Sequence, residues 1–193
     1  MHITNRHIRE ASKAPHIRVT MPRLRFVPAS LLRDTENPEA QLRVLNNSLI
    51  TAAATGTIRE MERMLCMDAK VNAVDMDLNT SMHHVSIRGL SSKAERLLDS
   101  WHALINPRNS QGFTPLALAS AAGRTGTVRA IAVRYPKSYE AHYEILEAAN
   151  LAEKYKQAGI ASMLRRIAKE GTGFLGIRAP RCALTVSSPR DHV

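Results

Sequence analysis

The residues of this chain that could do chemistry include an adjacent histidine pair, His83 and His84. Two histidines hold one metal ion from one helix when they are four residues apart, because only then do they share a face. Adjacent histidines point to different faces, so we expect His84 to lie on the helix surface. His102 and His142 have no cysteine or carboxylate at a zinc-binding spacing either. The sequence therefore predicts no metal site.

The string G-x-G-x-x-G at residues 171–176 is a second candidate. A dinucleotide fingerprint needs a strand before the glycines and a helix after them, whereas here a helix end precedes them and Pro180 follows. Carboxylate pairs such as Asp75 and Asp77 have the positions of ordinary exposed side chains. No part of the sequence combines a nucleophile, a general base and a group that orients the base. We predict no cofactor site, no catalytic residue and no enzymatic activity.

Glycines that could end helices recur with a period of about 33 residues. Gly56, Gly89 and Gly123 are separated by 33 and 34 residues. Thr80 and Thr114, which could each begin a helix, are also 34 residues apart. Apolar residues of a second helix in each unit follow the same period: Met61, Met64 and Leu65; Ala94, Leu97 and Leu98; Val128 and Ile131. A period of this length is typical of stacked repeats.

The third unit contains the clearest local signals. Gly112 suits a tight turn, Thr114 can cap a helix, and Pro115 suits the first helical position. The segment Asn109-Ser-Gln-Gly-Phe-Thr-Pro-Leu-Ala-Leu-Ala-Ser-Ala-Ala-Gly resembles an ankyrin repeat. The second unit departs from the family pattern, with Ser81 in place of the proline, and the first unit lacks the Thr-Pro pair.

The resemblance implies an all-α fold, an ankyrin-repeat solenoid of stacked helix-turn-helix units joined by short hairpin loops. It also implies that His83 hydrogen-bonds to backbone between neighbouring units. We expect a basic, flexible N-terminal arm at 1–36, a repeat domain at 37–170 and a flexible tail at 171–193. The units are expected at about 46–76, 77–108, 109–140 and 141–170, the last a degenerate cap. A separate short helix over 37–46 should shield the open end of the stack, and loop tips should lie at 73–79, 107–113 and 137–142.

Charge is distributed unevenly along the 193 residues, whose net charge is +10. Residues 1–33 hold seven basic residues and one acidic residue, so the arm carries much of the excess. Such an arm could contact nucleic acid or anionic lipid, with the repeats as a scaffold, and this is the alternative function. No Sec-type signal and no membrane-spanning apolar run is visible. Of two cysteines, we expect Cys66 in the core and Cys182 exposed in the tail, which fits a reducing compartment, cytoplasmic or nuclear.

The resemblance also implies function, because ankyrin stacks bind proteins and rarely catalyse. The leading hypothesis is a non-enzymatic module that binds an unidentified protein partner through a concave groove. Stand-alone proteins of this kind occur in eukaryotes and in bacteria that live within host cells, where some are effectors secreted into the host; both sources fit. An apolar patch is expected where Ile87 and Leu118 are exposed beside Phe113. The predicted partner-binding residues are Asp77, Asn79, His84, Ile87, Arg88, Gln111, Phe113 and Leu118.

Overall fold

The computed structural model describes residues 37–136 and 138–175; for residues 139 and 171–175 it describes the backbone alone. All regular secondary structure within this part of the chain is helical, which confirms the all-α prediction. One isolated bridge joins Val74 to Thr80. The helices are α2 (Pro38–Ala54), α3 (Ile58–Cys66), α4 (Ser81–Arg88), α5 (Ser91–Asp99), α6 (Pro115–Ala121), α7 (Thr125–Ala132), α8 (Tyr139–Lys154) and α9 (Ala158–Leu175).

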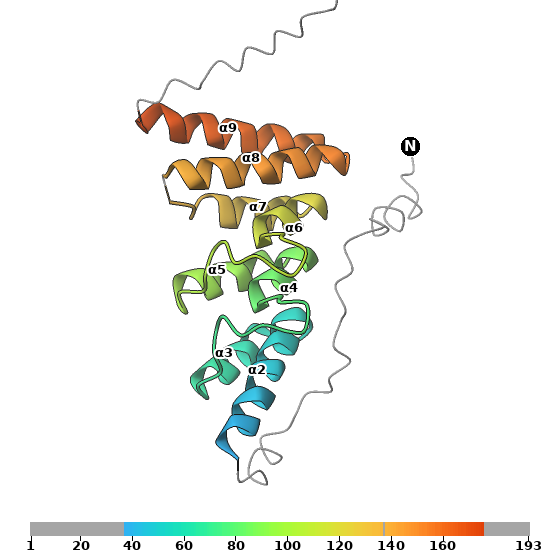
Figure 1. Ribbon diagram of the computed structural model, residues 1–193, viewed down its shortest axis with the longest axis vertical. Helices are drawn as coiled ribbons and strands as arrows, with labels where there is room; N and C mark the ends of the chain where they lie inside the picture. Colours follow the sequence, from blue (N-terminus) through green and yellow to red (C-terminus); the bar gives the residue numbers. More distant parts are fainter. Residues whose placement is uncertain (1–36, 137, 176–193) are drawn as a thin grey trace, which may run out of the picture.

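The helices are stacked as consecutive pairs along one long axis (Figure 1). In one row, α2 packs against α4, α4 against α6, and α6 against α8. The second member of each pair packs on its own first member, and α5, α7 and α9 also contact one another in order. Each pair therefore lies mainly against its immediate neighbours, and residues about 33 apart in sequence lie side by side.

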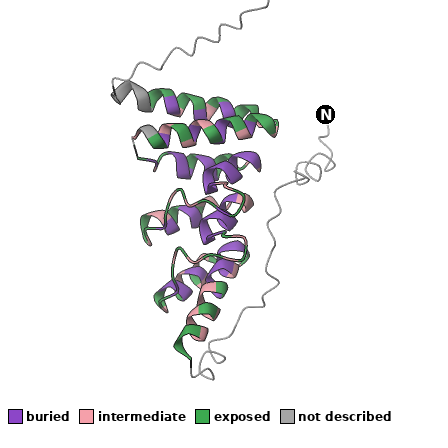
Figure 2. Cartoon of the chain, viewed as in Figure 1, coloured by how far each residue is buried: buried purple, intermediate pink, exposed green. Residues whose placement is uncertain are grey.

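The core runs through the centre of this stack (Figure 2). Most apolar positions predicted on the second helices are buried there, with Met61, Leu97 and Ile131 wholly inaccessible, whereas Leu98 is half-buried. Alanines occupy much of the remaining interior, including Ala53 and Ala119. Because alanine side chains are short, neighbouring helices can pack closely with few aromatic residues between them.

Helix starts follow the local signals of the sequence. Asn37 accepts a hydrogen bond from the Glu39 amide, and Pro38 occupies the first helical position of α2. Thr114 accepts from the Ala117 amide in the same way, with Pro115 next to it. These caps satisfy backbone donors that have no partner inside the helix, so the predicted starts at Asn37 and Thr114 are confirmed.

Three predicted boundaries are wrong. The separate helix at 37–46 does not exist, because the chain continues without a break into α2. The loop tip predicted at 137–142 is largely helix, since Ser138 caps α8 through the Ala141 amide and the helix begins at Tyr139. The tail predicted from residue 171 begins with five more helical residues, because α9 continues to Leu175.

The carboxyl ends of first helices are covered by side chains from the following pair. Lys93 of α5 donates from Nζ to the carbonyl oxygens of Ala52, Ala53 and Gly56, at 2.8, 2.9 and 2.7 Å. Arg124, just before α7, donates from Nε to the Ile87 carbonyl at 3.0 Å. A cation at a helix C-terminus also interacts favourably with the helix dipole, so these contacts join one pair to the next.

Candidate functional site

The loop between α3 and α4, residues 73–79, is organised by one carboxylate; we call it the first loop. Asp75 Oδ1 accepts hydrogen bonds from the amides of Asp77 and Asn79, at 2.9 and 2.8 Å. The backbone closes the same turn, with the Leu78 amide donating to the Asp75 carbonyl at 3.0 Å. Four residues are thus held by bonds within the loop, which fixes its shape.

His84 anchors this loop to helix α4. Its Nε2 lies 2.8 Å from Asp75 Oδ2, and its ring is fully buried. The prediction that His84 is exposed is therefore wrong. The first loop folds back over α4, and its carboxylate covers the face on which His84 lies. His84 positions the loop and presents no surface of its own to a partner.

Apolar side chains on the first loop face solvent. Val74 is 48% exposed, Leu78 is 49% exposed, and Met76 is fully exposed. They alternate with Asp75 and Asp77 in the sequence Val-Asp-Met-Asp-Leu. Our sequence reasoning singled out Asp77 here and missed the apolar residues. No strand-like pattern could have found them, because the backbone turns at Met76 and Asp77 and Leu78 is left-handed.

Leu78 holds a backbone conformation that does not suit leucine. Its φ is +57°, and the corresponding residue of the loop between α5 and α6 is Gly112, with φ +80°. Left-handed backbone costs a residue with a Cβ roughly 1–2 kcal/mol, whereas glycine adopts it freely. A leucine at this position strains the backbone while half of its surface remains in water. A contribution to folding stability therefore does not explain why leucine occupies this position.

The loop between α5 and α6, residues 107–113, is the second loop. Asn109 has the role that Asp75 has in the first loop, since its Oδ1 accepts from the amides of Gln111 and Phe113 at 3.1 and 2.9 Å. Its Nδ2 donates to Asn79 Oδ1 at 2.9 Å, and the Ser110 amide donates to the Asp77 carbonyl at 2.9 Å. The two loops are thus joined edge to edge.

His83 joins the second loop to α4. The Thr80 amide donates to His83 Nδ1 at 3.0 Å, so the ring proton is on Nε2, which donates to the Phe113 carbonyl at 3.1 Å. Burial lowers the pKa of His83 to about 4, although its bond to Phe113 opposes the shift. The contact is a structural one between neighbouring helical pairs, as the resemblance implied.

Several predicted partner-binding residues cannot present their side chains to a partner. Asn79 and Leu118 are buried along with His84, and Ile87, Arg88, Asp77 and Phe113 are half-buried. Gln111 alone of the eight is exposed. The predicted apolar patch is wrong, because α6 packs between α4 and α8 and Leu118 belongs to its interior. Three exposed apolar side chains lie on the first loop instead, while Leu104, Val133 and Tyr143 are exposed at separate places.

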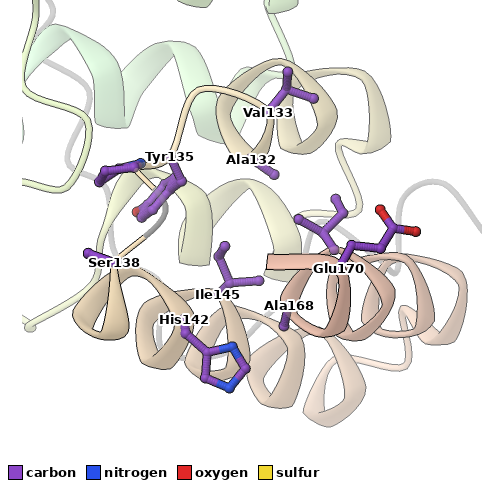
Figure 3. Close-up of a pocket in the computed structure, with 10 residues that line it drawn as sticks. Ala132, Val133, Tyr135, Ser138, His142, Ile145, Ala168 and Glu170 are labelled. Atoms are coloured by element: carbon purple, nitrogen blue, oxygen red, sulfur yellow. The ribbon is translucent and has the colours of Figure 1, made fainter. Parts of the chain in front are cut away.

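A cavity of about 250 Å³ lies between the end of α7, α8 and α9 (Figure 3). Ala132, Ile145 and Ala168 form much of its wall, and Tyr135 and His142 are among its polar lining residues. Burial raises the pKa of the Tyr135 hydroxyl. No side-chain hydrogen bond links a nucleophile to a base among the described lining residues. The described residues that line the cavity therefore do not form a recognisable catalytic site.

The structure also places the residues considered from the sequence for metal binding, membrane crossing and dinucleotide binding. Within residues 37–136 and 138–175, no cluster of metal-ligating side chains is formed and no helix is long and apolar enough to cross a membrane. The first two glycines of G-x-G-x-x-G lie within α9. Cys66 is exposed, so its predicted core position is wrong. The basic arm and Cys182 lie outside the described residues.

Comparison with known proteins adds no relative: no protein-family model matches the chain, and neither does any curated protein. The resemblance to ankyrin repeats therefore depends on the residues and period of this sequence.

Proposed function

We propose that this chain is an ankyrin-type repeat protein that acts by binding a protein partner, without catalysis. Support for the fold comes from the 33-residue period, the paired helices and the His83 contact between neighbouring pairs. The observation that carries the function is the first loop, where Val74, Met76 and Leu78 face solvent on a backbone held by Asp75. Exposed apolar groups gathered in one place are typical of a binding surface.

Rigidity makes this loop suited to binding. Ordering a flexible loop costs free energy on association, whereas Asp75 and His84 hold this one before a partner arrives. Ser110 and Asn109 extend the fixed surface to the second loop, which presents Gln111 at its edge. The partner surface thus has an apolar centre with a polar margin, the usual anatomy of an interface.

The chemistry of the loop also specifies its partner. Apolar side chains would pack on Met76 and Leu78, and a basic side chain would complement the negative charge of the half-buried Asp77. We therefore propose a partner segment that combines apolar and basic residues. The cytoplasm or nucleus is the proposed setting, either of the producing cell or of a host cell that receives the chain as a secreted effector.

The test is selection of peptides on the full chain, followed by binding to variants. A random peptide library displayed on phage should yield apolar peptides that carry Lys or Arg. We expect the double substitution Met76→Ser with Leu78→Gly to weaken their binding at least about tenfold, because it removes the exposed apolar centre. Leu78→Gly also relieves the strained φ, so the free energy of unfolding should stay equal or rise by up to about 1 kcal/mol.

The matched control is Val133→Ser, which removes an exposed apolar side chain at the end of α7 and should leave peptide binding unchanged. Equal affinity of the double variant and the wild type would refute the first loop as the site. Binding that disappears with residues 1–36 and falls steeply as salt rises would instead assign the activity to the basic arm, the alternative function.

A further inference from the structure

An open hollow of about 800 Å³ lies between α7 and the start of α9, and none of its lining residues belongs to either loop. Three cationic side chains line it, Arg129 from α7, Lys156 from the α8–α9 turn and Arg166 from α9. Thr125 and Ser162 add hydroxyl groups, and the described lining contains no carboxylate. We call this surface the cationic hollow.

Carboxylates neutralise several other arginines of the stack but form no ion pair with Arg129 or Lys156 within the described residues. Arg134 pairs with Asp99 at 2.6 Å, as one example, and Arg165 pairs with Glu153. In the same part of the chain, Arg166 has only Glu170, at 3.8 Å. Three positive charges around one hollow repel each other, and a bound anion would remove that repulsion.

The backbone around the hollow is fixed and adds positive potential. Two bonds close the turn after α8, from the Lys156 amide to the Glu153 carbonyl at 2.9 Å and from the Gln157 amide to the Ala152 carbonyl at 2.8 Å. They hold Lys156 at φ +61°. Two helix N-termini reach the hollow: α9 begins at Ala158, and α7 begins without a side-chain cap. Such termini carry partial positive charge.

The surface also has room for a ligand. A Cβ built on Gly159, in the first turn of α9, would meet no atom within 4 Å. The half-buried Met163 adds apolar surface beside the cations. The hollow could therefore hold an anionic group and, next to it, part of an organic body.

We propose that the cationic hollow binds the phosphate group of an organic phosphate monoester. Arg129, Lys156 and Arg166 would contact the phosphate oxygens, because guanidinium and ammonium groups form strong charge-assisted hydrogen bonds with them. The organic part would lie against Met163. This site is separate from the first loop and does not depend on the proposed function. The monoester could be a soluble molecule or a lipid headgroup, which present the same group.

The experiment is a calorimetric titration of the full chain with phenyl phosphate and with inorganic phosphate, at ionic strength held constant with chloride. A parallel arm measures co-sedimentation with phosphatidylcholine vesicles that contain or lack phosphatidic acid, whose headgroup is a monoester. The hollow variant combines Arg129→Gln, Lys156→Asn and Arg166→Gln. Asparagine is chosen for residue 156 because it tolerates positive φ. The control combines Arg43→Gln, Arg59→Gln and Arg63→Gln, which removes the same charge from exposed positions.

We expect saturable binding that the hollow variant weakens at least about tenfold and the control less than about twofold. Binding of the soluble probes would assign a soluble ligand, and binding of phosphatidic acid vesicles alone would assign a lipid headgroup. Equal weakening in both variants would overturn the proposal, since it would reflect net charge and the basic arm. Absence of saturable binding in both arms would overturn it as well. Unchanged urea midpoints would show that both variants fold.

Discussion

The free energy of unfolding should fall by about 3 kcal/mol as the pH is lowered from 6.5 to 4, because of the single side chain His83. Its Nδ1 already accepts the Thr80 amide proton and its ring is buried, so the folded protein resists protonation there. An unfolded chain has no such constraint. The ring then takes up its proton at the ordinary pKa of 6.5.

The sign follows from where the proton binds. The folded-state pKa of His83 is depressed to about 4, so between pH 6.5 and 4 the unfolded state binds more protons than the folded state. Lowering the pH in this window therefore favours unfolding. The stability that comes from neutral His83 is fully present above pH 6.5, is lost progressively towards pH 4 and changes no further below it.

The measurement is urea unfolding at several pH values for the wild type and for His83→Gln. Glutamine can accept from the Thr80 amide, as in a capping box, and donate to the Phe113 carbonyl, but it does not titrate. The difference in unfolding free energy between the two proteins should therefore change by about 3 kcal/mol across the window. Other titrating groups contribute to both proteins. Parallel pH profiles would contradict the assignment.

Replacement of Lys93 by methionine should destabilise the chain by roughly 3 kcal/mol. The ammonium donates to three carbonyl oxygens at the end of α2 and the turn after it, and the residue is only 6% exposed. Burial lowers the pKa of Lys93, with the positive charge of Arg88 acting in the same direction and Glu60 opposing. Methionine keeps most of the stem but leaves the carbonyls without their donor.

Urea unfolding at neutral pH tests this expectation. Lys70→Met is the matched control, because Lys70 is exposed and its replacement should change the unfolding free energy by less than about 0.5 kcal/mol. The slope of free energy against urea should stay the same in both variants, so that the midpoints report stability alone. A loss at Lys93 no larger than at Lys70 would show that water or rearranged backbone satisfies the carbonyls.

Local signals determined where much of the helical structure lies. Thr114 and Pro115 begin a helix because a cap and a preset φ act over four residues, whatever lies beyond them. The apolar positions of the second helices, such as Leu97 and Ile131, are buried as their spacing predicted. Boundaries were harder to predict. No helix breaker stands between residues 46 and 48, so α2 continues there, and α9 continues through Gly171 and Gly173, where a tail was expected.

Only the tertiary structure decided which side chains are available. Leu118 and His84 are buried because neighbouring helices and the first loop cover them, and a helical pattern does not say how many sides of a helix are covered. Cys66 is exposed for the converse reason: no element covers it.

The two surfaces proposed for binding also depend on the tertiary structure and not on local sequence signals. The strained Leu78 and the fixed first loop depend on Asp75, whose contacts span up to nine residues. The cationic hollow brings together Arg129 and Arg166 from different helices. Lys93 reaches carbonyls about 40 residues earlier in the chain. The sequence by itself determined the helices and their caps through short-range contacts, whereas surfaces and long-range donors depend on how the helices are packed together.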